Sequence, residues 1–423
     1  MVNNFVHTNY LVKSFLFFGI FPLLPVKLLG LPVILFFIVS IISFILDRNK
    51  KLDYRKFLIA ISPYFLFFIS ALYSEDIGLG IKKITEARLS LFVVPLSFFL
   101  LSKKSINIVK LQVFNFKLIY VASSFLMSII YLCYLPFVVE SNNPSFRFPT
   151  GFFFKSAAAN MPYWYLEPVY FSFIITIAFV FLSNLYNNNK IKIFYFIIIS
   201  IVYFSVLFLM VSKLALIFIA IFVLWLLFYK IKNIKQRVII ISLLLITLYP
   251  IYRIPSVKYE IEEIQYFIKG KKRAKDDPND KRSRITESSF ELIKKINPVF
   301  GTGIGDVQRD LNKVYKEKKY KDLLKKKYDV HNQFISMYLG GGVIGVIVLF
   351  IYLFILIRLS INNRQVFFLW ICIFFIMQMC TETVLERQLP VIIMSFITSI
   401  ILFLQIDNIK IDECLSEKLI REE

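Results

Sequence analysis

The two residue types that build most metal and redox sites are scarce in this sequence. It has two histidines and four cysteines among 423 residues. Cys133, Cys372 and Cys380 lie inside apolar runs, Cys414 lies in a polar tail, and no zinc-ligand or disulfide spacing occurs. We therefore expect neither a metal site nor a disulfide framework.

Charged residues are also few, at 18% of the chain, whereas hydrophobic residues make up 58% and the mean hydropathy is +0.68. This balance excludes a soluble core, because lipid must be the solvent for most of the chain. The alternating pattern of a membrane β-barrel is absent, and backbone amides in hydrocarbon need partners within their own segment. The sequence thus predicts an all-α, polytopic membrane protein.

Apolar runs long enough to cross a bilayer, about 17–25 residues each, recur along the chain. The first run continues through three prolines into the second without a cleavage site, so the first helix is expected to act as its own insertion signal. We predict about 12 transmembrane helices, near residues 10–25, 27–46, 57–73, 89–101, 118–139, 169–186, 193–210, 213–229, 238–252, 333–357, 366–380 and 388–405.

The net charge of +22 does not indicate a nucleic-acid partner, because the basic residues are scattered between apolar spans. With a cytoplasmic N-terminus, the short inner loops hold seventeen Lys and Arg residues and the short outer loops hold seven. This bias predicts that both termini are cytoplasmic and that a long hydrophilic loop lies outside. The predicted divisions are helices one to nine (1–252), the outer loop (253–332), helices ten to twelve (333–405) and a cytoplasmic tail (406–423).

The outer loop has apolar residues at helical spacing in segments 257–268 and 285–296, and a very basic helix is expected at about 307–327. Between the last two, Pro298 ends a helix, and Gly301 and Gly303 permit a tight turn. This turn lacks the preceding strand and the spacing of a dinucleotide loop. We expect it to bring the backbone close to a ligand or a lipid headgroup.

His331 stands where the loop re-enters the membrane, and His7, in the polar N-terminus, is the other histidine. An imidazole can accept a proton near neutral pH, so His331 is a candidate base at the outer mouth of the bundle. The alternative interpretation is an interfacial histidine that hydrogen-bonds water.

Cations on the same predicted side could bind phosphate, since guanidinium forks match phosphate oxygens. A solvated surface is the alternative for the arginines of the loop, whereas Lys213, between two spans, needs a partner. The carboxylates Glu86, Glu382 and Glu386 are expected partners, and Glu382, Glu386 and Arg387 lie within helical reach of one another. The candidate cations are Lys82, Lys83, Arg88, Lys213, Arg282, Arg284 and Arg387.

The chain resembles the O-antigen ligase and polymerase family of the bacterial envelope. The resemblance is carried by RSRITESSFELIKKINPVFGTGIGD and HNQFISMYLGGGVIGVIVLF, with support from ITEARLSLFVVPLSFF, EPVYFSF and TETVLERQLPVII. It extends from about residue 80 to residue 400. Two positions depart from the family pattern: Lys213, in VSKLAL, replaces an arginine, and Glu167 stands where some relatives carry histidine.

The resemblance implies glycosyl transfer without metal, nucleotide or other cofactor, at the outer side of the inner membrane. The donor would be an undecaprenyl-diphosphate-linked glycan, and the acceptor a lipid A-core sugar or another glycan. It implies that His331 is the essential histidine and that Arg282 or Arg284 is the loop arginine. Lys213 keeps the charge of the usual arginine but loses its bidentate fork.

Three functions stay open from the sequence: a ligase that moves a finished glycan, a polymerase that joins lipid-linked repeat units, and a non-enzymatic glycan or lipid transporter. A transporter would be expected to show internal repeats or charges at mid-membrane, whereas the charges here collect at the outer rim. The HNQF and LERQ segments resemble the ligase branch, which we prefer.

Overall fold

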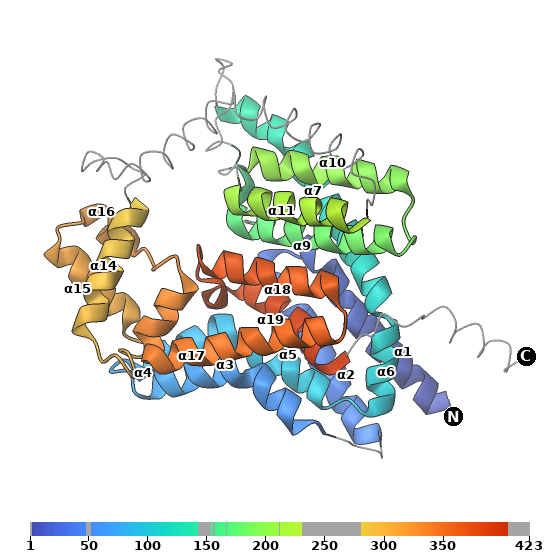
Figure 1. Cartoon of the computed structure of the whole chain (residues 1–423), viewed down its shortest axis with the longest axis horizontal. Helices are drawn as coiled ribbons and strands as arrows, with labels where there is room; N and C mark the ends of the chain where they lie inside the picture. The colour runs from blue at the N-terminus through green and yellow to red at the C-terminus, as the bar shows by residue number, and fades with distance from the viewer. Residues whose placement is uncertain are drawn as a thin grey trace, which may run out of the picture. The chain divides into compact units, whose positions relative to one another are not determined.

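The computed structural model describes residues 2–47, 52–142, 154, 157–165, 167–210, 212–230 and 281–404. All regular secondary structure in these ranges is helical, which confirms the predicted all-α class. The chain forms two compact units (Figure 1). The first comprises Met1–Gly19, Leu29–Lys117 and Glu287–Glu423, and the second comprises Ile20–Leu28 and Leu118–Thr286.

The first unit is built around α3, α5, α17 and α19. In it α3 runs beside α17, and α5 packs against both α3 and α19 (Figure 1). Buried phenylalanines hold α1, α2, α5 and α19 together, with Phe15 and Phe396 at a ring distance of 5.3 Å and Phe36 and Phe98 at 5.1 Å. Its helices are α1 (Val2–Phe17), α2 (Leu31–Leu46), α3 (Tyr54–Leu72), α4 (Ile77–Lys83), α5 (Ser90–Phe99), α6 (Lys103–Leu111), α15 (Val307–Glu317), α16 (Lys321–Lys326), α17 (Gln333–Asn362), α18 (Val366–Met379) and α19 (Gln388–Ser399).

The second unit contains most of α7 (Val113–Asn142) together with α9 (Pro168–Asn187), α10 (Ile193–Leu209) and α11 (Lys213–Lys230). α9 packs against α10 and α11, and most of its side chains are buried. Tyr203 on α10 donates its hydroxyl to the carbonyl of Val121 on α7 at 2.8 Å. α14 (Lys281–Lys295) begins in this unit and continues into the first.

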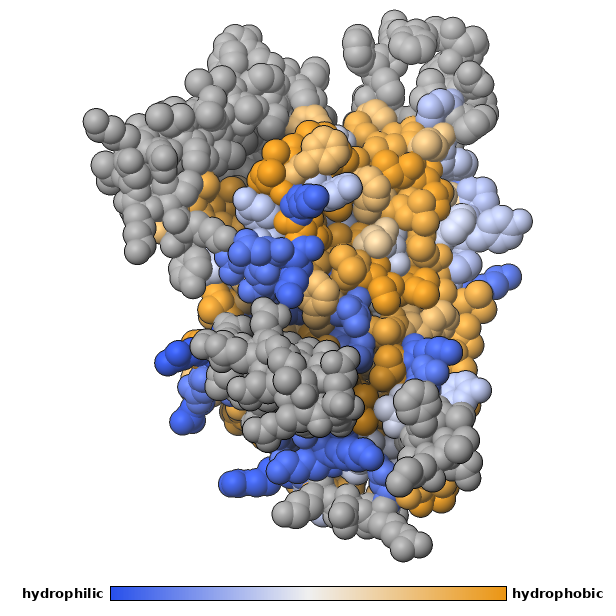
Figure 2. Space-filling model, turned by 90° about the vertical axis from the view of Figure 1, so that its right-hand side faces the viewer, coloured by the Kyte–Doolittle hydropathy of each residue, from blue (hydrophilic) through white to orange (hydrophobic). Residues whose placement is uncertain are grey.

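Five helices in the described ranges are long and apolar enough to cross a membrane, or six if the bent pair α5 and α6 is one span. Shorter apolar helices are α10, α11, α18 and the α19 region. Hydrophobic side chains cover wide areas of the surface, as expected of helices that face lipid (Figure 2). The predicted count of about 12 spans is not confirmed.

Local sequence accounts for part of this difference. The predicted span 10–25 is α1, which ends at Phe17, followed by a 3₁₀ turn that contains Pro22. The predicted span 89–101 is α5 alone, and the chain then bends by 110° because Ser102 caps the new helix α6 through the amide of Ser105. The predicted span 238–252 lies outside the described residues.

The segment 253–332, predicted to lie outside the membrane, differs from the prediction in one helix. The predicted helix 285–296 is present as α14, and segment 257–268 lies outside the described residues. The single helix expected at about 307–327 is wrong, because α15 and α16 are separated by Lys319 in the left-handed conformation, at φ +61°. The break lets Tyr315 and Leu323 both enter the core, each 0% exposed.

Candidate active site

The site is centred on His331, immediately before α17. Asn332 caps α17 by accepting a hydrogen bond from the amide of Ile335 at 3.0 Å. His331 itself has a φ of +47°, in the left-handed region that few residues other than glycine adopt. Such backbone strain is found where surrounding contacts fix a side chain in place, as at active sites.

Two carboxylates face the same nitrogen of the imidazole. Nδ1 of His331 lies 3.0 Å from Oε2 of Glu382 and 3.3 Å from Oδ1 of Asp329. The side chain of His331 is 27% exposed, so this pairing is partly shielded from water. Because both carboxylates accept hydrogen bonds, the pairing favours the proton on Nδ1 and makes Nε2 the basic nitrogen.

Asp329 is itself held by three other groups. Its Oδ1 accepts the backbone amide of His331 at 3.2 Å. Its Oδ2 accepts the hydroxyl of Thr383 at 3.1 Å and lies 3.5 Å from the guanidinium of Arg387. Asp329 therefore ties the approach to α17 to the segment between α18 and α19.

The helical arrangement predicted for Glu382, Glu386 and Arg387 is wrong. α18 ends at Met379, a 3₁₀ turn covers Val384–Glu386, and α19 begins at Gln388. The three side chains reach three different partners, since Glu382 faces His331, Glu386 faces Arg88 and Arg387 faces Asp329. The segment between α18 and α19 therefore forms no α-helix, and it hydrogen-bonds to the start of α17.

Two side-chain amides make these hydrogen bonds, one from the N-cap of α17 and one from its first residue. The side chain of Gln333 accepts the amide of Leu385 at 2.7 Å, and the side chain of Asn332 donates to the carbonyl of Cys380 at 2.9 Å. Gln333 is 0% exposed. The HNQ sequence thus positions the segment that carries Glu382.

Arg88 lies at the end of a π-helical turn, Ile84–Arg88, and is 2% exposed. It donates Nε to the carbonyl of Leu385 at 3.1 Å, lies 3.6 Å from Glu386, and stacks over the ring of Phe67 at 4.3 Å. Burial lowers the pKa of Arg88, and the charge of Glu386 opposes this shift. An arginine keeps its charge in such a site because its ordinary pKa is so high. These partners are protein groups, and the contact of Arg88 with phosphate stays a prediction.

A small cavity of about 20 Å³ lies beside this ion pair, large enough for one water molecule. Lys83 lies at its wall and donates to the carbonyl of Ile304 at 2.8 Å. Burial lowers the pKa of Lys83, and the charge of Glu386 opposes this shift. The hydroxyl of Ser336 donates to Glu386. The polar lining residues are Lys83, Arg88, Gln308, Asp329, Ser336 and Glu386.

The glycine turn that contains Gly301 and Gly303 packs closely against other parts of the protein. Gly301 and Gly303 have φ values of +69° and +86°. A Cβ at Gly301 would lie 2.4 Å from the carbonyl oxygen of Leu339, and one at Gly303 would lie 2.3 Å from the hydroxyl of Ser74. The close approach that we expected toward a ligand is therefore accounted for by packing on α17 and α3.

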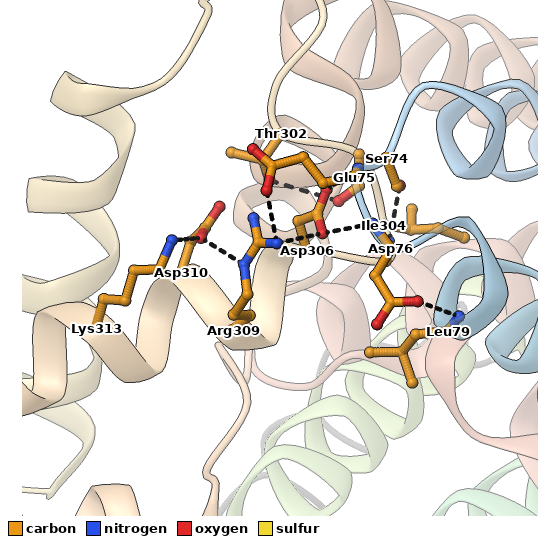
Figure 3. A network of polar contacts seen from close by, with 12 residues as sticks. Ser74, Glu75, Asp76, Leu79, Thr302, Ile304, Asp306, Arg309, Asp310 and Lys313 are labelled. Atoms are coloured by element: carbon orange, nitrogen blue, oxygen red, sulfur yellow. Dashed lines mark hydrogen bonds and ion pairs between the residues drawn. The ribbon is translucent and has the colours of Figure 1, made fainter.

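After this turn, a polar network fixes the start of α15 to the loop between α3 and α4 (Figure 3). Asp306, 1% exposed, accepts the amides of Glu75 at 2.6 Å and Asp76 at 3.1 Å. Arg309 bridges Asp306 and Glu75 at 3.2 and 2.8 Å. The segment that precedes α15 is thus anchored beside the cavity at two points, Ile304 and Asp306.

The other predicted residues divide between the two units. Glu86 is exposed and pairs with Lys82 at 3.8 Å. Lys213 is the exposed first residue of α11. Lys213, Arg282 and Arg284 all belong to the second unit, so their action together with His331 stays a prediction.

Sequence reasoning missed Asp329, Gln333 and Ser336. Asp329 offered the clearest signal, an acidic residue two positions before the candidate histidine. No group of three or more His, Cys, Asp or Glu side chains that could hold a metal occurs within the described ranges.

No curated protein matches the chain. The sequence model of the O-antigen ligase family matches residues 198–350, a range that contains Lys213, Arg282, Arg284 and His331. Together with the apolar helices, this match identifies a membrane protein. It confirms the resemblance predicted from the sequence: over residues 198–350 the chain is similar to the O-antigen ligase family.

Proposed function

We propose that this protein transfers a glycan from an undecaprenyl-diphosphate-linked donor to a sugar of lipid A-core, on the outer side of the inner membrane. The observation that carries the proposal is the imidazole of His331 held through Nδ1 by Glu382 and Asp329. The family match over residues 198–350 supports the class of reaction.

In this mechanism the acceptor hydroxyl approaches Nε2 of His331. Oxygen attacks the anomeric carbon of the donor and its proton passes to Nε2, because a sugar hydroxyl is a poor nucleophile while it keeps its proton. The bond from the anomeric carbon to the diphosphate breaks, and undecaprenyl diphosphate leaves with the electron pair. Glu382 and Asp329 stabilise the imidazolium that forms, as the aspartate does in a Ser-His-Asp triad.

The leaving diphosphate requires fixed cations, since negative charge develops on it in the transition state. We assign this role to Lys213 and to Arg282 or Arg284, with Arg88 and Arg387 as the cations of the first unit. Of the two cations of the first unit, Arg88 is buried, whereas Arg387 is about half exposed beside Asp329, which also faces His331. The donor is already activated as a diphosphate ester, and the proposed transfer uses no metal, nucleotide or other cofactor.

A polymerase that joins lipid-linked repeat units would use the same groups on a different acceptor, so the product must decide between the two functions. The test is deletion of the gene followed by gel analysis of the surface glycans. A ligase deletion leaves lipid A-core bare and the glycan on its lipid carrier. Lipid A-core that retains a single repeat unit would overturn the proposal in favour of a polymerase, and unchanged glycans with a lost transport activity would favour a transporter.

The proposed transfer also requires an orientation. We propose that both termini are cytoplasmic and that segment 253–332 is periplasmic, as a domain between the ninth and tenth transmembrane helices. The seventeen to seven distribution of Lys and Arg between short loops supports this orientation.

A further inference from the structure

Helix α17 is interrupted at one residue. Gly342 has φ +61° and ψ −157°, a conformation essentially restricted to glycine. A Cβ at this position would lie 2.1 Å from the carbonyl oxygen of Val299. α17 therefore consists of a short stretch, 333–341, and a long stretch, 343–362.

The glycine turn of the outer loop supplies the hydrogen bonds that the break removes. The amides of Val343 and Ile344 donate to the carbonyls of Pro298 at 2.8 Å and Val299 at 3.5 Å. In return, the carbonyl of Leu339 accepts the amide of Thr302 at 2.8 Å. The turn thus completes a broken helix, which a membrane helix requires because lipid offers its backbone no partner.

The end of α3 meets the same break. The hydroxyls of Ser70 and Tyr73 both donate to the carbonyl of Gly340, and the hydroxyl of Tyr73 also donates to the carbonyl of Phe300. α3 ends at Leu72. One apolar helix therefore ends where the long stretch of another begins.

The length of that stretch matches a bilayer. Residues 343–362 number 20, and at about 1.5 Å per residue they span about 30 Å, the thickness of the hydrocarbon core. All 30 residues of α17 would span about 45 Å, which exceeds it. The break is therefore the natural position of the hydrocarbon boundary.

Val299 and Phe300, at the tip of the turn, are 42% and 53% exposed. Such apolar exposure is unusual for a polar loop, but α3 and α17, which the turn contacts, also expose apolar side chains. These exposed side chains are Phe65, Phe68, Ile69 and Leu72 on α3 and Val343, Ile344, Ile347, Phe350, Ile351 and Phe354 on α17.

We propose that the edge of the hydrocarbon core lies at Gly342 and that the tip of the turn 297–303 enters the hydrocarbon. Val299 and Phe300 then contact lipid chains. The short stretch 333–341 then rises at most about 14 Å from the boundary, which places His331 on the headgroup side of the hydrocarbon. This membrane contact holds whatever reaction the site performs, so it goes beyond the proposed transfer.

The test places tryptophan at the tip in the full chain, as Phe300→Trp and separately as Val299→Trp, in vesicles of phosphatidylcholine brominated on its acyl chains. The control is Phe290→Trp, because Phe290 on α14 is also 53% exposed. The three native tryptophans form a background that is subtracted with the parent protein.

Both tip variants are expected to be quenched more strongly by bromine near the ester end of the chain than near its methyl end. The control is expected to be quenched by aqueous iodide and little by lipid. Quenching of both tip variants by iodide alone, or equal lipid quenching at positions 290 and 300, would overturn the proposal. Unchanged chromatographic behaviour of each variant shows that it is folded, and failure here leaves the transfer proposal untouched.

Discussion

At the residue scale, two carboxylates share one imidazole nitrogen, and this sharing predicts a non-additive response. Glu382→Gln and Asp329→Asn each leave the other carboxylate on Nδ1 of His331, so each single change is expected to slow transfer by about 10-fold. The double change replaces both carboxylates with neutral amides, and its loss is expected to exceed the product of the two single losses, reaching up to about 10⁴-fold.

The measurement is the transfer rate in membranes at matched protein abundance. Glu317→Gln is the control, because Glu317 is exposed on α15 and pairs with Lys295. Wild-type transfer by the double variant would show that the carboxylates do not orient His331.

A second residue-scale prediction concerns the buried pair of Arg88 and Glu386. Arg88→Met leaves the carboxylate of Glu386 and the carbonyl of Leu385 without the guanidinium, and breaking such a pair costs on the order of 3 kcal/mol. The double variant Arg88→Met with Glu386→Leu removes both charges and is expected to recover part of that loss.

Thermal unfolding in detergent measures both variants. An unchanged melting temperature of Arg88→Met would show that the buried pair does not stabilise the fold.

Some features of the candidate site could be predicted from the sequence and others could not. The position of His331 immediately before an apolar helix was predictable, because an apolar run follows it directly. Its catalytic role stays a prediction. Asp329 as its partner was not predicted, although it is only two residues away. The partner of Arg88 could not be predicted, because Glu386 is 298 residues distant and only the packing of α5 on α19 brings the two regions together.

At the element scale, the break in α17 gives a matched pair of substitutions. Gly342→Ala forces a Cβ to within 2.1 Å of Val299 and demands a conformation that alanine does not adopt, so severe loss of folded protein is expected. Gly341→Ala adds a Cβ in ordinary contact with Leu66, at 3.7 Å, and is expected to be tolerated or slightly stabilising.

Folded yield by size-exclusion chromatography compares the two variants. Equal yields would show that the glycine at 342 is dispensable and that the helix closes its own hydrogen bonds.

Helix periodicity predicted α14 well because its apolar side chains follow one face and Pro298 stops it. It failed for α15 and α16 because the basic run between them looks uniformly helical, while burial of Tyr315 and Leu323 requires a turn. It failed again after α18, where side-chain amides of Asn332 and Gln333 compete successfully for the backbone. Helix periodicity carries no information on either cause, which was burial in the first case and tertiary hydrogen bonding in the second.

At the scale of the whole molecule, the proposed orientation can be tested by labelling in intact cells. In a variant without native cysteines, a cysteine at exposed Lys319 on the outer loop is expected to react with a membrane-impermeant thiol reagent. A cysteine at exposed Asn188, between α9 and α10, is expected to react only after the cells are opened. The reverse pattern would invert the topology and place His331 on the cytoplasmic side.

The most direct measurement of the central claim is glycan transfer by the purified full-length protein in lipid nanodiscs. The assay supplies an undecaprenyl-diphosphate-linked glycan and lipid A-core and follows the glycosylated product. We predict transfer by the parent protein and a loss of about 10²–10⁴-fold in His331→Ala, because the general base is removed. His331→Gln separates orientation of the hydroxyl, which glutamine can preserve, from proton acceptance, which it cannot. Transfer by His331→Ala at the parent rate and equal folded abundance would contradict the account and leave His331 as an interfacial residue without a catalytic role.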